Sequence, residues 1–308
     1  MTLRRRIIDY IAGHAMLFAT VFSGLLVVAI GIALYLRARP LLSTHSLGQL
    51  VLNDTWMPSS GQFGLKPFLV GTFWVTGLAT ILAVPICLLA AVYLAEYAGP
   101  RIRAVVKPLI DLLAGIPSVV YGVWAVLVVV PFIADVLGPY AAAHWGRIPL
   151  LATEFTTGFS VLAGAVVLAI MICPVIVTIT DEVLRAVPAE YREASYVLGA
   201  TRFETITRVV ARKSLPGLVA AVVLGISRAL GETMAVLMVV GNVPITPKSV
   251  FDPAYPLPAL IANNYGEMMS IPLYDAALLG SAFLLLIVVL AFNVLARLVL
   301  AQAIRRAA

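Results

Sequence analysis

Charged residues are scarce in this sequence. Asp, Glu, Lys and Arg make up 12% of the 308 residues, about half of the roughly 25% that is usual in soluble domains. Hydrophobic residues make up 62%. This composition excludes an ordinary soluble domain and indicates a polytopic membrane protein. The net charge is +6, but the basic residues flank apolar runs and form no patch with interleaved aromatics, so no nucleic-acid partner is expected.

The residues needed for common catalytic sites are also missing. The sequence has no Gly-x-x-x-x-Gly-Lys-Ser/Thr loop for binding ATP, and its three histidines stand apart, with no His-Glu-x-x-His pair. No Ser/His/Asp set can be assembled within the apolar runs. Cys87 and Cys173 both lie in such runs, which favours buried free thiols over a disulfide framework. We therefore expect a non-catalytic chain that holds neither a metal nor a cofactor.

Six apolar runs are long enough to cross a bilayer. They cover residues 15–36, 68–95, 108–134, 159–180, 217–241 and 276–300. An even number places both termini on one side, and most of the 21 Lys and Arg residues fall on that side. The positive-inside rule therefore predicts cytoplasmic termini. The first run follows Arg4-Arg5-Arg6 without a small-residue cleavage site, so we interpret it as a retained helix.

These runs predict an all-α membrane protein with six transmembrane helices. We divide it into residues 1–67, a first helix with an exterior loop, and residues 68–308, a transmembrane domain. The exterior tract 53–61 is rich in turn-forming residues. The outer segment 243–275 is rich in proline, which favours extended and turn structure. The longest cytoplasmic connection is residues 181–214.

Two ionisable residues interrupt the fifth apolar run. If residues 218–240 form one helix, Arg228 lies near the centre of the bilayer, and Glu232, four positions later, lies on the same face and can pair with it. A charge at that depth costs about 3 kcal/mol or more unless it meets a partner or water. The two residues are therefore either ligands for a substrate or a structural ion pair that never contacts one.

The third run contains Pro117 in the sequence Gly115-Ile-Pro-Ser118, followed by Tyr121-Gly122. A proline in a membrane helix frees a backbone carbonyl that neighbouring groups must satisfy. The feature is either a packing kink or a bent helix that lines a path, with Ser118 and Tyr121 facing that path.

Residues 189–214 mix charges with apolar residues. Tyr196, Phe203, Ile206 and Val210 recur at helical spacing and predict one apolar face, whereas Gly199 should interrupt the helix. We expect two short helices joined near Gly199 at the membrane surface. They either bind a soluble protein or form a simple amphipathic connector.

Three motifs resemble those of a known family. The sequence Glu193-Ala194-Ser195-x-x-x-Gly199 resembles the EAA loop of binding-protein-dependent ABC importer permeases, with serine in place of the third alanine. Residues 228–236, Arg-Ala-Leu-Gly-Glu-Thr-Met-Ala-Val, and residues 114–122 are similar to the permeases of phosphate-specific importers, the Pst system. The ending Gly-Glu-Thr-Met-Ala-Val is more similar to the PstC-type than to the PstA-type subunit.

This resemblance implies a type I ABC importer permease (MetI-like) fold in a bacterial inner membrane. It implies that Glu193, Ala194 and Gly199 dock into a separate ATPase that binds ATP-Mg, with Arg192 and Arg202 tuning the contact. Further implied partners are a homologous PstA-type permease, a second ATPase copy and an extracytoplasmic phosphate-binding protein, all assembled in lipid.

A planar guanidinium can bind two phosphate oxygens at once, which suits Arg228 for the role of anion ligand. Glu232 would neutralise the resting site and accept a hydrogen bond from the proton on phosphate. Two other function classes stay open. One is an ion-coupled secondary anion transporter, and the other is a membrane-embedded enzyme or a structural assembly subunit.

Overall fold

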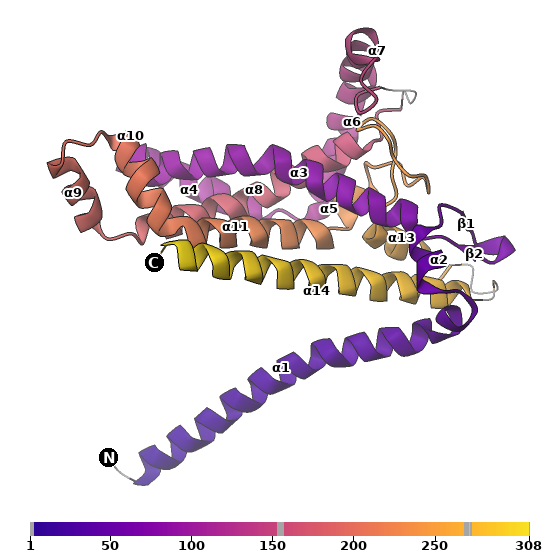
Figure 1. The fold of residues 1–308 in the computed structure, drawn as a ribbon, viewed down its shortest axis with the longest axis horizontal. Coiled ribbons are helices and arrows are strands. Elements are labelled where there is room, and N and C mark those ends of the chain that lie inside the picture. Colours follow the sequence, from indigo (N-terminus) through magenta and orange to yellow (C-terminus); the bar gives the residue numbers. More distant parts are fainter. Residues whose placement is uncertain (1–2, 153–156, 268–270, 272, 308) are drawn as a thin grey trace.

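The computed structural model describes residues 3–152, 157–267, 271 and 273–307 (Figure 1). In chain order the helices are α1 (Leu3–Thr44), α2 (Leu47–Leu52), α3 (Lys66–Val92), α4 (Pro100–Gly115), α5 (Ser118–Leu127), α6 (Val129–Phe132), α7 (Gly138–Trp145), α8 (Val161–Arg185), α9 (Ala189–Val197), α10 (Arg202–Glu204), α11 (Ala211–Gly231), α12 (Met234–Leu237), α13 (Leu257–Asn264) and α14 (Tyr274–Ala307). Three π-helical segments, Tyr93–Tyr97, Ile133–Leu137 and Thr205–Val210, continue or join these helices. One hairpin, β1 (Trp56–Met57) and β2 (Gln62–Phe63), closes around the turn Pro58–Ser60.

Helices α3 and α8 form the centre of the bundle. Small side chains line their contact, among them Ala79 and Ala83 of α3 and Ala165 of α8, all buried. A Cβ added at Gly164 would lie 3.3 Å from Val75 Cγ1, so the two backbones approach closely, as is usual where membrane helices pack through small residues. Cys87 and Cys173 are free thiols on this pair of helices.

Helix α1 packs against α14 near its C-terminal end. Ala38 and Leu41 are buried there, and the rings of Tyr35 and Phe283 lie 5.7 Å apart. The N-terminal half diverges from the bundle and is exposed (Figure 1). The start of α1 and the end of α14 lie at the same end of the molecule as α9 and α10 (Figure 1). We call that end the coupling end and the opposite one the outer end.

Six helices among the described residues are long and apolar enough to span a membrane, which confirms the predicted number. The predicted third span was wrong in its position. Residues 108–134 do not form one helix, because α4 ends at Gly115 and α5 begins at Ser118. Pro117 disfavours helical backbone at Ile116, which adopts ψ 129°. The membrane-crossing stretch is Ser118–Trp145.

The predicted single helix over residues 218–240 was also wrong. Helix α11 ends at Gly231, and Glu232 adopts an extended backbone with φ −71° and ψ 130°. Glycine is a poor helix former, and the Glu232 carboxylate accepts a hydrogen bond from the Ala235 amide (3.3 Å), at the start of the short helix α12. The apolar residues after Glu232 concealed this break in the sequence.

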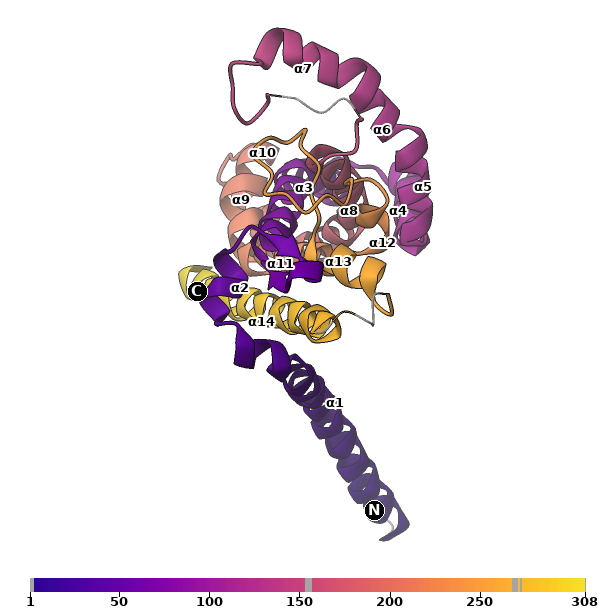
Figure 2. The ribbon, with the colours of Figure 1, turned by 90° about the vertical axis from the view of Figure 1, so that its right-hand side faces the viewer.

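The outer end is built from α2, the hairpin, α13 and the connections around them (Figure 2). Its core includes Phe63, Phe68, Tyr255 and Tyr274. Residues 243–256 contain neither long helices nor strands, as the prolines predicted, but Leu257–Asn264 form helix α13. The exterior tract 53–61, predicted as a loop, includes β1 and the turn that leads to β2.

Candidate functional site

Two broken helices meet inside the bundle. The break between α4 and α5 and the break between α11 and α12 belong to the two sequence motifs that resembled phosphate permeases, and α5 packs against α12. A Cβ added at Gly122 would lie 2.6 Å from Met238 Sδ and 3.2 Å from Ala235 Cα. Only glycine permits this approach. We call Ser118, Tyr121, Arg228 and Glu232 the broken-helix site.

Arg228 lies in the last turn of α11, and its side chain is exposed. A cation is favourable there, since the last carbonyls of a helix carry partial negative charge. Among the residues that the structure describes, no carboxylate oxygen lies within 4.0 Å of Arg228. The predicted pairing of Arg228 with Glu232 was therefore wrong. The helix on which it depended ends before Glu232, and the half-buried carboxylate serves α12 instead.

Tyr121 links the two halves of the third span. Its hydroxyl donates a hydrogen bond to the Leu113 carbonyl (2.8 Å), on the other side of the Pro117 break. The ring is buried. Ser118 begins α5 and is half-buried. The hydrogen bond of Tyr121 thus stabilises the break between α4 and α5. That Ser118 and Tyr121 line a path stays a prediction.

At the coupling end, α9 and α10 are joined through Gly199, as the sequence predicted. Gly199 has φ +81°, a left-handed conformation that favours glycine. Its amide donates to the Tyr196 carbonyl (2.9 Å), and the Ala200 amide donates to the Ser195 carbonyl (3.2 Å). The Ser195 and Thr205 hydroxyls are hydrogen-bonded at 2.9 Å in a buried position, so serine at this position fixes α9 to the segment after α10.

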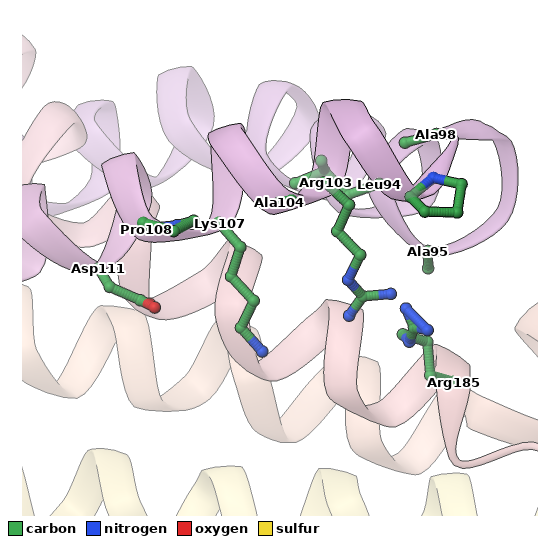
Figure 3. A pocket seen from close by; sticks show the side chains of 10 residues that line it. Leu94, Ala95, Ala98, Arg103, Ala104, Lys107, Pro108, Asp111 and Arg185 are labelled. Atoms are coloured by element: carbon green, nitrogen blue, oxygen red, sulfur yellow. The ribbon is translucent and has the colours of Figure 1, made fainter.

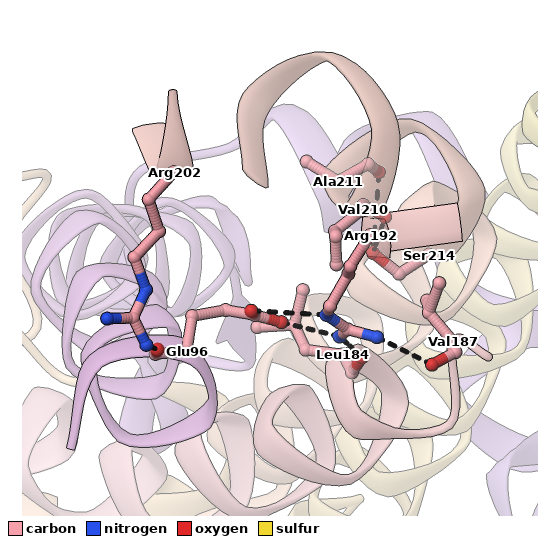
Figure 4. Close-up of polar contacts among 8 residues, drawn as sticks. All are labelled: Glu96, Leu184, Val187, Arg192, Arg202, Val210, Ala211 and Ser214. Carbon is pink, nitrogen blue, oxygen red and sulfur yellow. Dashed lines mark hydrogen bonds and ion pairs between the residues drawn. The ribbon is translucent and has the colours of Figure 1, made fainter. Parts of the chain in front are cut away.

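Buried polar contacts attach this segment to the bundle (Figure 4). Arg192 binds Glu96 through both carboxylate oxygens, at 2.5 and 3.2 Å. It also donates to the carbonyls of Leu184 (2.8 Å) and Val187 (2.7 Å). These hydrogen bonds and the ion pair join α9 to the π-helical segment after α3 and to the end of α8.

Arg202 also points into the chain. It donates to the Glu96 carbonyl and lies 4.7 Å from the centre of the Tyr97 ring. Both guanidinium groups are engaged within the chain, and a role for Arg192 and Arg202 in tuning a contact with an ATPase stays a prediction. Sequence reasoning missed Glu96; the available signal was a carboxylate at the end of an apolar run.

Other side chains of α9 and α10 face outward. Glu193 and Ala194 are exposed. Large apolar side chains are also exposed: 87% of Val197, 88% of Leu198 and 67% of Phe203. The predicted apolar face was wrong as a single face, because Ile206 and Val210 are buried while Tyr196 and Phe203 are exposed. Tyr196 precedes the turn at Gly199, whereas Phe203 follows it in α10, ahead of the buried residues of the segment Thr205–Val210. We call the exposed apolar side chains the coupling surface: Tyr191, Tyr196, Val197, Leu198 and Phe203.

No group of three or more His, Cys, Asp or Glu side chains in the described ranges could hold a metal ion. A cavity of about 350 Å³ lies on the outer side of α12, between Phe159, Met238 and Pro253. The candidate functional features of the chain are thus the broken-helix site within the bundle, the cavity beside α12 and the apolar coupling surface at the coupling end.

These features, together with six apolar helices among the described residues, are typical of one class of protein, the multi-pass membrane permeases. Solved inward-facing structures of the MetNI methionine ABC transporter have the same fold, with TM-scores of 0.50 and 0.52 at 18% and 20% identity, covering 78% of this chain and 94% of each matched chain. The chain belongs to the binding-protein-dependent transport system inner membrane components, whose family model matches residues 83–307, and within them to the PstC group.

The curated relatives support this placement over most of the chain. The phosphate transport system permease protein PstC of Xylella fastidiosa (strain 9a5c) is 38% identical over 254 residues, 82% of this chain and 78% of the relative. The PstC of Mesorhizobium japonicum is 34% identical, covering 88% and 83%. A probable ABC transporter permease, YqgH of Bacillus subtilis, is 41% identical, covering 69% and 64%.

Proposed function

We propose that this chain forms half of a membrane pathway for inorganic phosphate, driven by ATP hydrolysis on a separate subunit. The observation that carries the proposal is the exposed Arg228 guanidinium at the point where two broken helices meet. The names of the PstC relatives support phosphate as the substrate.

The chemistry of the broken-helix site suits an oxyanion. Phosphate carries one or two negative charges at neutral pH, and Arg228 offers two parallel N–H donors to its oxygens. Because Arg228 has no carboxylate partner among the described side chains, its charge is available to a ligand. Glu232 is close in sequence and half-buried. It can accept a hydrogen bond from the protonated oxygen of phosphate, a donor that sulfate lacks.

The coupling surface is proposed to bind the ATPase. Its apolar side chains are too exposed to serve the fold of this chain, and contiguous exposed apolar groups with polar neighbours mark protein interfaces. Glu193, Ala194 and Gly199 lie beside them. The complete transporter would then contain a PstA-type permease, two ATPase subunits that bind ATP-Mg, and an extracytoplasmic phosphate-binding protein.

The orientation follows from this assignment. We place the coupling end, with both termini, in the cytoplasm of a bacterial cell, and the hairpin and α13 outside. We also retain residues 1–67 as a peripheral unit and residues 68–308 as the permease domain proper, with the coupling loop at 181–214.

The test is phosphate uptake by Arg228→Ala and Glu232→Gln variants in membranes where assembly and ATPase activity persist. We expect Arg228→Ala to reduce uptake by about tenfold or more, since charge-assisted hydrogen bonds to the anion are lost. Glu232→Gln should reduce uptake and weaken discrimination against sulfate. Arg39→Ala, which removes an exposed arginine at the outer end of α1, is the control. Normal uptake in both site variants would contradict the substrate role.

A further inference from the structure

A second cationic feature lies at the coupling end. A pocket of about 540 Å³ opens between the end of α3, helix α4 and the end of α8 (Figure 3). Three cations line it, Arg103 and Lys107 of α4 and Arg185 of α8, against one carboxylate, Asp111. None of the residues of the broken-helix site or of the coupling surface lines this pocket, and the proposed function gives it no role.

The cations point into one space. In Figure 3 the guanidinium groups of Arg103 and Arg185 face each other, the Lys107 ammonium points into the same region, and Asp111 lies at the far end. Like charges that face each other repel unless an anion lies between them. Adjacent guanidinium groups therefore need a counter-charge, and Asp181 supplies part of it to Arg103.

The carboxylates nearby leave part of this positive charge free. Asp181 accepts from Arg103 Nη2 at 2.6 Å, but Arg103 Nη1 is buried and has no hydrogen-bond partner among the described residues. Glu182 lies 4.0 Å from Lys107, and both side chains are well exposed, so that pair is weak. Arg185 is exposed and makes no ion pair with any described carboxylate.

We propose that this pocket binds a phosphate group, presented either by inorganic phosphate or by the headgroup of an anionic phospholipid. The fixed fork of the exposed Arg185 guanidinium matches the oxygens of a phosphate, and the Lys107 ammonium supplies a second cation. The free-phosphate form rests on the proposed transport function, as a site on the coupling side of the path. The lipid form does not depend on it.

The surroundings suit both sources. Helix α4 exposes Ile102, Val105 and Leu109 beside the pocket, a surface that acyl chains can cover. The pocket lies at the end of the membrane-crossing helices α3 and α8, which is the depth of lipid headgroups. It is also open at the coupling end, where a transported ion would leave the protein.

The experiment uses the purified chain, with any subunits that co-purify, in lipid nanodiscs. One arm measures inorganic phosphate binding in phosphatidylcholine nanodiscs by calorimetry, in an Arg228→Ala background so that the broken-helix site does not contribute. The other arm counts phosphatidylglycerol molecules retained on the protein, by native mass spectrometry. Arg185→Gln is compared with Arg101→Gln, which removes the same charge from an exposed position of α4 outside the pocket.

We expect Arg185→Gln to lower binding by about tenfold in one arm, and Lys107→Gln to lower it in the same arm. Arg101→Gln should have no effect. A loss in the phosphate arm identifies a free-ion site, and a loss in the lipid arm a headgroup site. Unchanged binding in both arms, or an equal loss with Arg101→Gln, overturns the proposal.

Melting temperatures identify any variant that is misfolded, and the single Lys107→Gln variant then replaces Arg185→Gln. Neither arm measures transport. Loss of uptake in Arg228→Ala with intact binding at this pocket therefore supports both proposals, while normal uptake in both Arg228→Ala and Glu232→Gln contradicts the proposed function and leaves the lipid form of this proposal standing.

Discussion

At the scale of single residues, the pair formed by Glu96 and Arg192 decides how the coupling segment is held. Only 6% of the Glu96 side chain and 18% of the Arg192 side chain are exposed. Removing one partner from a buried ion pair leaves the other charge desolvated and costs about 3–5 kcal/mol. Two backbone carbonyls would still accept from Arg192, which favours the lower value.

We therefore predict that Glu96→Gln lowers the stability of the chain by about 3 kcal/mol. Thermal unfolding in nanodiscs, followed together with proteolysis near α9, measures the effect. Glu190→Gln, which changes an exposed carboxylate on α9, the helix of Arg192, should unfold at the parental temperature. If Glu96→Gln behaves like this control, the pair does not anchor the segment.

Long-range pairs of this kind could not be read from the sequence. Glu96 and Arg192 are 96 positions apart, and neither is unusual locally, so nothing in a single sequence couples them. The internal contacts of Arg192 and Arg202 could not be predicted for this reason, and their assignment to an external contact stays a prediction. Gly199 was different, since an isolated glycine between two helical patterns has a local physical cause, and its position in the turn was predicted correctly.

At the scale of elements, the turn between α9 and α10 depends on one left-handed residue. A non-glycine side chain at φ +81° is strained by about 1–2 kcal/mol. No atom lies within 4 Å of a Cβ at Gly199, so the strain comes from the backbone alone. The coupling surface should lose its fixed shape without loss of the bundle.

We predict that Gly199→Val lowers the number of phosphate ions transported per ATP hydrolysed, while the protein still assembles. The ratio is measured in proteoliposomes that contain the complete transporter. The matched control is Gly99→Val, since Gly99 precedes α4 with an extended backbone (φ −69°, ψ 162°) and open space around its Cβ. A parental ratio in Gly199→Val would argue against coupling through this turn.

The close packing of α5 against α12 depends on Gly122. A Cβ at Gly122 would press on Met238 Sδ and on the Ala235 backbone, and overpacking of this kind typically costs about 1–3 kcal/mol. Gly122→Ala should therefore separate the two broken helices and reduce uptake. Adding Met238→Ala should restore part of the uptake, because it removes the sulfur but not the backbone contact.

The control for this pair is Gly77→Ala, at a helical position of α3 with no atom within 4 Å of the added carbon. An equal loss of uptake in Gly77→Ala, or no recovery in the double variant, would contradict the packing explanation.

The sequence predicts the number of membrane spans but not where two of the helices are interrupted. Hydropathy located the six spans because each run is long enough to cross a bilayer. The same measure joined α4 to α5 and α11 to α12, because apolar residues continue past both breaks. Pro117 and the Gly231-Glu232 pair were the local signals of these interruptions. The sequence alone leaves Pro117 as a packing kink or part of a bent helix that lines a path, and Glu232 as a substrate ligand or an ion-pair partner of Arg228, since only tertiary contacts show where the helices stop.

At the scale of the whole molecule, the broken-helix site and the coupling surface lie on one covalent route. Helix α11 follows α10 through the π-helical segment Thr205–Val210 and ends beside Arg228, so movement of the coupling segment reaches the site along a single helix. α11 packs along α8 and α14. A two-state movement driven by ATP would expose the site alternately to the two sides of the membrane.

Gly231 can report this movement directly. It is exposed at the end of α11, and a Cβ there meets no atom within 4 Å, so a cysteine fits without distortion. In a background that carries Cys87→Ala and Cys173→Ala, we predict that Gly231→Cys changes its rate of labelling by a membrane-impermeant maleimide severalfold when a non-hydrolysable ATP analogue is added to the assembled transporter. Gly99→Cys, at an exposed position before α4 with open space around its Cβ, should label at one rate. A nucleotide-independent rate at Gly231→Cys that responds instead to an ion gradient would favour the secondary transporter.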